Sequence, residues 1–176
     1  LFAKLMLWGH PYMGLLILLG AVSLWALRGR PADPAKSALL ASFTLFALGG
    51  VLGYLIQGVN VVIPAHYHGS TVGVTLAFMG LAYVLLPTLG FGRAEGRMAI
   101  WQPYVYGAGQ LIHVLGLAWS GGYGVQRKVA GAEQMLTTLP QKVGMGMMGL
   151  GGLIAVIGGL MFVLVCLQAM SRRGAR

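Results

Sequence analysis

Two histidines separated by one residue, His66 and His68, lie inside a long apolar stretch that runs from Val59 to Leu86. An ionisable ring in hydrocarbon is costly, so a histidine inside a membrane segment marks a candidate functional site. Residues i and i+2 of an α-helix point about 200° apart, so the two rings face nearly opposite sides of one helix. Such a pair does not readily close on one small ion, as an i,i+4 pair does. It can serve two bulky groups, one on each side. The alternative is that both rings are hydrogen-bonded to neighbouring helices.

The composition indicates that these rings lie in a membrane. Hydrophobic residues make up 57% of the 176 residues and charged residues only 9%, whereas a soluble domain usually carries about 25% charge. The apolar runs are as long as the roughly 20 residues that a spanning helix needs, and the alternation typical of β-barrel strands is absent. The sequence therefore predicts an all-α polytopic membrane protein that forms one transmembrane domain over residues 1–176.

Five spanning helices are predicted, at residues 5–27, 37–57, 61–86, 100–119 and 143–170. Proline clusters and a glycine-rich loop at 120–141 separate them. With five spans, eight of the 12 lysines and arginines fall on the side of the C-terminus. The positive-inside tendency then places the C-terminus in the cytoplasm and the N-terminus outside. We expect an integral protein of a bacterial inner membrane.

Several other chemistries are excluded by the same residues. The three carboxylates, Asp33, Glu95 and Glu133, all fall in predicted loops, so no acid pair inside the membrane can carry out general acid–base work. The net charge of +9 is concentrated at segment ends, where topology and lipid head groups account for it, and nucleic-acid binding is not expected. Cys166 is the single cysteine and is interpreted as a small buried hydrophobe. Glycines at packing spacing, including the G-x-G-x-x-G at 144–149, indicate close helix contacts.

A basic pair gives the two histidines a further context. The third span enters from outside near Val59, so His66 lies about seven residues in, or roughly 10 Å deep at 1.5 Å per residue. Arg127 and Lys128 follow the outer end of the predicted fourth helix. A macrocycle held edge-on by His66 or His68 could therefore place its acidic edge near these bases. An axial imidazole with basic anchors for propionates makes a coherent haem site. The alternative for the basic pair is an ordinary solvated loop.

Two blocks of the chain resemble the catalytic subunit of the haem–copper oxidases. The run Gly49 to Gly53, followed by Val62 to His68, is similar to the family's GG-x-x-G run and V-V-A-H-F-H-like motif. The run Gln110 to Leu117, followed by Gly124 to Val129, is similar to the family's M-H-F-L-G-L and G-M-P-R-R-V stretches. The resemblance covers nearly all of the chain as the family's last five helices, the eighth to the twelfth. It implies an oxygen reductase or a nitric oxide reductase.

The resemblance implies a role for each matching residue. His66 resembles the axial ligand of the high-spin, catalytic haem iron. His68 resembles one axial ligand of the low-spin, electron-transferring haem iron. Tyr67 takes the aromatic position between them, while Arg127 and Lys128 resemble the pair that anchors the propionates. The implied cofactors are two haems, with copper possible through ligands outside this chain.

The remaining histidines and the departures from the family pattern limit what this chain does alone. His113 resembles a family histidine that is not an iron ligand, and we expect it to be packed or hydrogen-bonded. His10 is a weak candidate for a copper role. The family's copper-binding histidines and second low-spin haem ligand lie upstream of the matching part, without counterparts here. Lys128 stands where arginine is usual, which loses a bidentate fork.

Three functions follow as hypotheses. The leading one is a haem-binding membrane subunit that forms the C-terminal part of a respiratory core reducing O₂ or NO, inactive alone. Other subunits would supply the remaining ligands, and a cytochrome c or a quinol would supply electrons. The second is a non-catalytic haem electron-transfer subunit. The third is a cofactor-free structural subunit of a membrane complex.

Overall fold

The structure is a computed structural model that describes residues 9, 16, 19, 20, 23, 33–129 and 131–172, with Ala132 described by its backbone alone. These residues form four long helices: α2 (Pro34–Tyr54), α3 (Val62–Thr88), α4 (Arg97–Gly122) and α5 (Leu139–Ser171). A short 3₁₀ helix, η1 (Gly131–Gln134), lies in the loop before α5. The part of the chain described here contains no strand, and an isolated bridge joins Asn60 and Gln126. The all-α prediction is confirmed. The predicted helix at 5–27 lies outside the described residues, apart from five isolated positions.

Three predicted helix starts were late by three or four residues, and local capping signals account for two of them, those of α2 and α5. Asp33 caps α2 by accepting a hydrogen bond from the Ala35 backbone N–H at 3.1 Å, and proline is well tolerated in a first helical turn. Thr138 and Gln141 form a capping box at the start of α5. Both patterns are readable in the sequence, but Pro34 was interpreted as part of a helix-breaking segment, and residues 139–141 were assigned to the glycine-rich loop.

The other helix ends also differ slightly from their predicted positions. α3 continues through Pro87 to Thr88, so the prediction that Pro87 stops the helix was wrong by two residues. α4 extends three residues beyond its predicted span at each end. The loop between α4 and α5 is correspondingly shorter than the predicted 120–141 segment.

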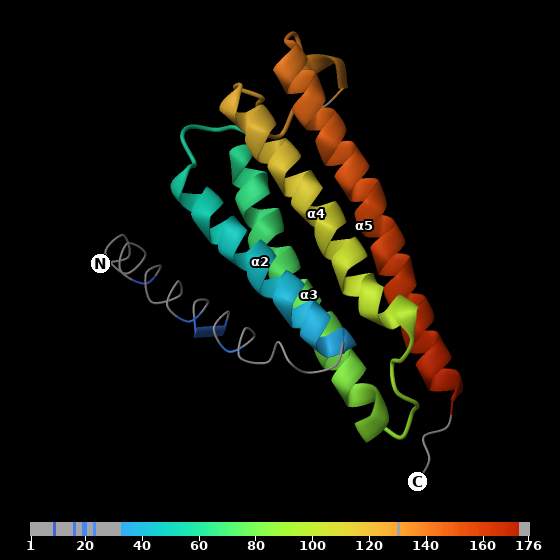
Figure 1. Ribbon diagram of the computed structural model, residues 1–176. Helices are drawn as coiled ribbons and strands as arrows, with labels where there is room; N and C mark the ends of the chain where they lie inside the picture. The colour runs from blue at the N-terminus through green and yellow to red at the C-terminus, as the bar shows by residue number, and fades with distance from the viewer. Residues whose placement is uncertain are drawn as a thin grey trace.

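Glycines set the two closest helix pairs, α2 with α3 and α4 with α5 (Figure 1). A Cβ atom added to Gly69 would lie 2.7 Å from the Cα atom of Gly49, so α2 and α3 meet backbone to backbone. On the other pair, a Cβ added to Gly109 would lie 2.9 Å from the Cα of Ala155. The predicted packing role of glycines is confirmed at these contacts. It was wrong for Gly146 and Gly149, where an added Cβ atom would meet nothing within 4 Å.

A buried glutamine ties three helices together at the other end of the bundle. Gln102 is fully buried, and its Nε2 donates a hydrogen bond to the Gly158 carbonyl at 3.0 Å. The hydroxyl of Tyr83 donates to Gln102 Oε1 at 2.8 Å. Because a buried polar group costs free energy unless it is paired, these bonds fix α3, α4 and α5 relative to one another.

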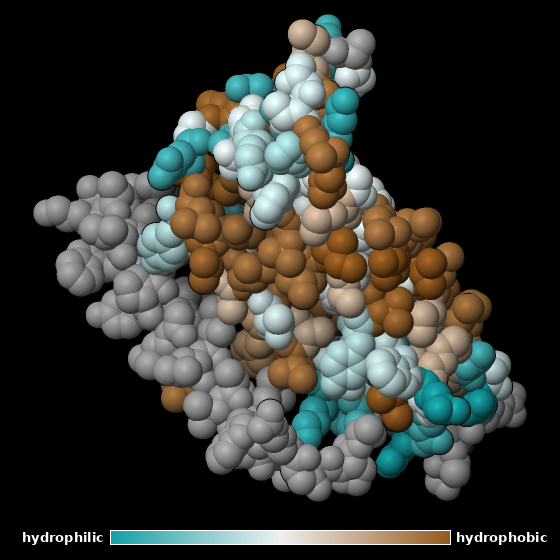
Figure 2. Space-filling view, turned by 45° about the horizontal axis from the view of Figure 1, so that its top comes forward, coloured by the Kyte–Doolittle hydropathy of each residue, from teal (hydrophilic) through white to brown (hydrophobic). Residues whose placement is uncertain are grey.

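The surface of the helices supports a membrane environment. α2, α3 and α5 are long and apolar enough to cross a membrane by length and composition. Large apolar side chains on all three are exposed, including Val51, Phe78 and Leu160. Figure 2 shows hydrophobic residues across the middle of one face and hydrophilic residues toward its ends. This arrangement is the one expected of helices surrounded by lipid.

Candidate functional site

His66 faces α2 and is held there by one hydrogen bond. Its Nδ1 lies 2.7 Å from the carbonyl oxygen of Gly49. A carbonyl oxygen only accepts, so Nδ1 carries the ring proton and Nε2 keeps a lone pair. No residue in the described part of the chain bonds to Nε2. A histidine that binds metal usually donates its other ring N–H to such a carbonyl, so His66 has the tautomer and support of a ligand.

A glycine on α2 makes room for this ring. A Cβ atom added to Gly53 would lie 3.0 Å from both Nδ1 and Cε1 of His66. Any larger residue at position 53 would therefore press on the imidazole. Gly49 and Gly53 are one helical turn apart and act together. The Gly49 carbonyl accepts the hydrogen bond from the ring, and Gly53 leaves space for the ring.

His68 faces a different neighbour. Its side chain is exposed, and its ring centroid lies 4.7 Å from that of His113 on α4, in an edge-to-face arrangement. His66 thus contacts α2 and His68 contacts α4, so the prediction that the two rings serve different sides of one helix is confirmed. Their predicted roles as iron ligands remain predictions.

His113 is more closely connected to the site than the sequence indicated. Its Nδ1 donates to the Met148 carbonyl oxygen on α5 at 2.9 Å, which confirms the expected hydrogen bond. Its Nε2 is buried without a partner among the described atoms. A histidine inside an apolar helix marks a candidate functional site, and this signal was present in the sequence. The sequence did not show that α4 places His113 beside His68. His10 lies outside the described residues.

Tyr67 lies between the two ligand candidates and points away from the helix contacts. It is 60% exposed, and its ring centroid lies 5.4 Å from that of His66 with the planes tilted by 45°. An aromatic ring here can cover one edge of a flat group bound at His66.

The basic pair follows α4, as the sequence predicted, and the structure places it beside the start of α3. The backbone N–H of Val61 donates to the Val125 carbonyl at 3.0 Å, and Asn60 pairs with Gln126 in an isolated bridge. These two contacts place Arg127 next to residue 60. His66 lies six residues further along the helix, or about 9 Å in axial rise.

The side chains of this pair are available to an anion. Arg127 is half-buried and Lys128 is exposed, and neither forms a salt bridge within the described ranges. Lys128 has a φ of 62°, a left-handed conformation that is uncommon for a residue with a side chain. A functional requirement for the lysine would explain why this position is not a glycine.

The donor set suits a cofactor that brings most of its own ligands. Among the described residues, no three His, Cys, Asp or Glu side chains gather to hold a metal ion. A single imidazole with a free ring nitrogen can give one bond to a metal, and an iron porphyrin takes only axial ligands from the protein. The two haems expected from the sequence remain a prediction.

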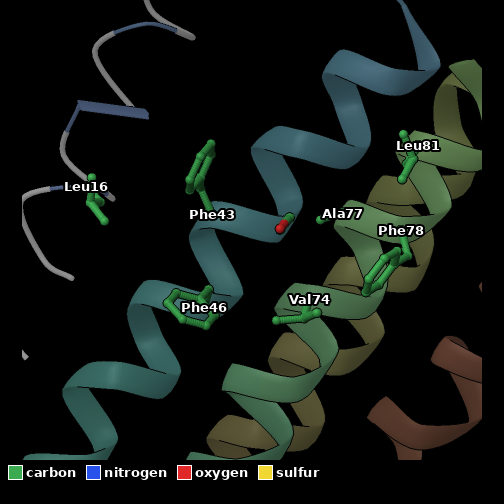
Figure 3. A pocket seen from close by; sticks show the side chains of 8 residues that line it. Leu16, Phe43, Phe46, Val74, Ala77, Phe78 and Leu81 are labelled. Carbon is green, nitrogen blue, oxygen red and sulfur yellow. The ribbon is translucent and has the colours of Figure 1, made fainter.

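A groove between α2 and α3 offers no chemistry of its own. It has a volume of about 470 Å³ and is lined by apolar side chains, with Ser42 as the exception. Figure 3 shows Phe43 and Phe46 from α2 and Val74 and Phe78 from α3 around it. Small-molecule sites need a few converging polar groups to fix their ligand, which this groove lacks.

Comparison with known proteins gives relatives without an assigned function. The chain is 43% identical over 149 residues to an uncharacterized protein of Rickettsia prowazekii, a match that covers 77% of this chain and 28% of that protein. It is 31% identical over 72 residues to an uncharacterized protein of Aquifex aeolicus, covering 41% of this chain and 19% of that protein. The match thus spans little more than a quarter of the Rickettsia protein and about a fifth of the Aquifex protein. No protein-family model matches the chain. No solved structure matches it.

Proposed function

We propose that this chain is a haem-binding membrane subunit that forms the C-terminal part of a haem–copper oxidase-like respiratory core. In this proposal His66 is an axial ligand of a high-spin haem and His68 of a low-spin haem. The observation that carries it is the state of His66, with Nδ1–H bonded to the Gly49 carbonyl and Nε2 free. The placement of His68 on another side of the same helix supports two groups rather than one.

The residues of this chain would position the haems. When bound, the two haem irons would carry electrons from a donor to O₂ or NO. Gly49 fixes the ring plane and the tautomer of His66. Arg127 and Lys128 would hold the propionates by charge-assisted hydrogen bonds, which are about twice as strong as neutral ones. The remaining axial ligand and any copper ligands would come from a part of the complex outside this chain. The donor would be a cytochrome c or a quinol.

The membrane arrangement in this proposal has five spans, with α4 among them. Exposed Trp101 and Trp119 lie near the two ends of α4. Each packs against a tyrosine, Tyr104 and Tyr123 respectively. Eighteen residues separate the tryptophans, which is about 27 Å of helix and close to the roughly 30 Å of a hydrocarbon core. Tryptophan and tyrosine are enriched at both membrane interfaces. The predicted first helix would be the fifth span, with the C-terminus in the cytoplasm of a bacterium.

The test is the haem spectrum of the purified membrane complex and of two single variants. We expect His66→Ala to remove only the high-spin signal and His68→Ala to remove or perturb only the low-spin signal. Gln102→Leu is the control and should retain both. If both ligand variants keep both signals, the ligand assignment is wrong. A complex without any haem would support the hypothesis of a cofactor-free structural subunit. A complex with haem but without copper would support the hypothesis of a non-catalytic electron-transfer subunit.

A further inference from the structure

Among the described residues, only two buried side-chain atoms have no hydrogen-bond partner: Gln110 Oε1 and His113 Nε2. Unpaired buried polar atoms are rare in proteins, and each needs an explanation. The two residues are three apart on α4 and therefore lie on the same face of that helix. Of the two, His113 is the one whose ring contacts His68.

The proton on His113 can be placed from its one hydrogen bond. Nδ1 donates to the Met148 carbonyl oxygen, so Nε2 is left as an acceptor without a donor. The same ring meets the ring of His68 on α3 edge to face, with 4.7 Å between the ring centroids.

The needs of the two neighbouring rings are complementary. A histidine that binds metal through one nitrogen donates the other N–H to an acceptor, which fixes the ring orientation and raises its basicity. His66 has the Gly49 carbonyl for this purpose. His68 has no hydrogen bond in the described part of the structure, and the adjacent His113 holds an acceptor that lacks a donor.

We infer that His113 is a positioning residue for His68. Its Nε2 accepts the Nδ1–H of His68 when His68 binds iron through Nε2, and Met148 holds the His113 ring in place from α5. This inference rests on the proposed function. It adds that α4 sets the ring orientation and the electron donation of His68 on α3, through an imidazole instead of a backbone carbonyl.

The experiment compares midpoint potentials of the low-spin haem in the membrane complex carrying single variants. In His113→Leu the acceptor is lost, so the His68 imidazole donates less electron density and the oxidised iron is less stabilised. We expect the low-spin potential to shift upward, with an altered low-spin electron paramagnetic resonance signal and an unchanged high-spin haem. His113→Gln keeps an acceptor oxygen and should restore most of the potential. Gln110→Leu is the matched control, since it removes the other unpaired acceptor on the same face and should leave the potential unchanged.

The outcomes separate the inference from the proposed function. If His68→Ala removes the low-spin haem but His113→Leu equals the unaltered protein, the positioning role is wrong and the ligand assignment stands. If Gln110→Leu shifts the potential as much as His113→Leu, the effect is not specific to the ring contact and the inference also fails. A complex in which no haem signal depends on His68 refutes both. If the His113→Leu complex does not assemble, the low-spin haem potentials of His113→Gln and His113→Asn are compared instead. The longer glutamine amide is expected to reach His68 and the shorter asparagine amide is not. Equal potentials in these two variants would overturn the inference.

Discussion

Replacing Gly49 by alanine should separate α2 from α3 and disturb His66 at the same time. A Cβ atom on Gly49 would lie 2.7 Å from the backbone carbon of Gly69, whereas ordinary contacts begin near 3.4 Å. The backbone nitrogen of Ser70 lies closer still, so the helices must move apart by at least about 0.7 Å, since backbone cannot rotate away as a side chain can. The hydrogen bond from His66 to the Gly49 carbonyl, now 2.7 Å, would lengthen past the useful range of about 2.7–3.2 Å.

The expected cost can be worked out against a neighbouring control. Overpacking of this kind costs about 1–3 kcal/mol, and the lost hydrogen bond adds about 1 kcal/mol. Gly50 is the adjacent residue on the same helix, and nothing lies within 4 Å of a Cβ added there. Both alanine variants gain the same helix propensity, about 1 kcal/mol, which cancels in the comparison. Gly49→Ala should therefore be less stable than Gly50→Ala by about 2–4 kcal/mol.

The assay is detergent-titrated unfolding of the purified protein, followed by circular dichroism, for the two variants side by side. Gly49→Ala should unfold at a clearly lower fraction of denaturing detergent, and Gly50→Ala at or above the fraction for the unaltered protein. Equal stabilities, within about 0.5 kcal/mol as is usual for surface substitutions, would refute the backbone-to-backbone contact of α2 and α3. A Gly49→Ala protein with reduced stability but an unchanged high-spin haem would refute the dependence of His66 on the Gly49 carbonyl.

Three further predictions concern the helices around the site. If α4 crosses the membrane, Glu95→Cys and Glu133→Cys in a Cys166→Ala background should react with an impermeant thiol reagent from opposite sides; reaction from one side would refute the span. Gln102→Leu leaves a buried tyrosine hydroxyl unpaired and should lower unfolding stability by about 1–3 kcal/mol without changing either haem signal. Gln141→Ala removes the capping box of α5, at about 1 kcal/mol; hydrogen exchange should become faster at residues 139–143, and unchanged rates there would contradict the cap.

The site depends on long-range contacts that no local pattern encodes. The i,i+2 spacing of His66 and His68 predicts opposite directions because helical geometry is fixed by the backbone. That spacing does not reveal the acceptor at Gly49, which is 17 positions away along the chain, or the pairing of His68 with His113. The glycines at 49, 53 and 69 are visible in the sequence as packing residues. The sequence does not show that the Gly49 carbonyl accepts a hydrogen bond, that Gly53 leaves room for the His66 ring, or that Gly69 contacts backbone. These separate roles follow from the way α2 and α3 cross.

By itself, the sequence determined the class of protein, the positions of four helices to within four residues, and the candidate residues at 66, 68, 127 and 128. These follow from hydrophobicity and from the helical repeat, which act over a few turns of chain. The tertiary structure alone decided which nitrogen of His66 is free, where the basic pair lies relative to α3, and that His113 stands beside His68. The reason is physical: glycine contacts and hydrogen bonds between helices set the register of one helix against another, and that register decides which side chains meet.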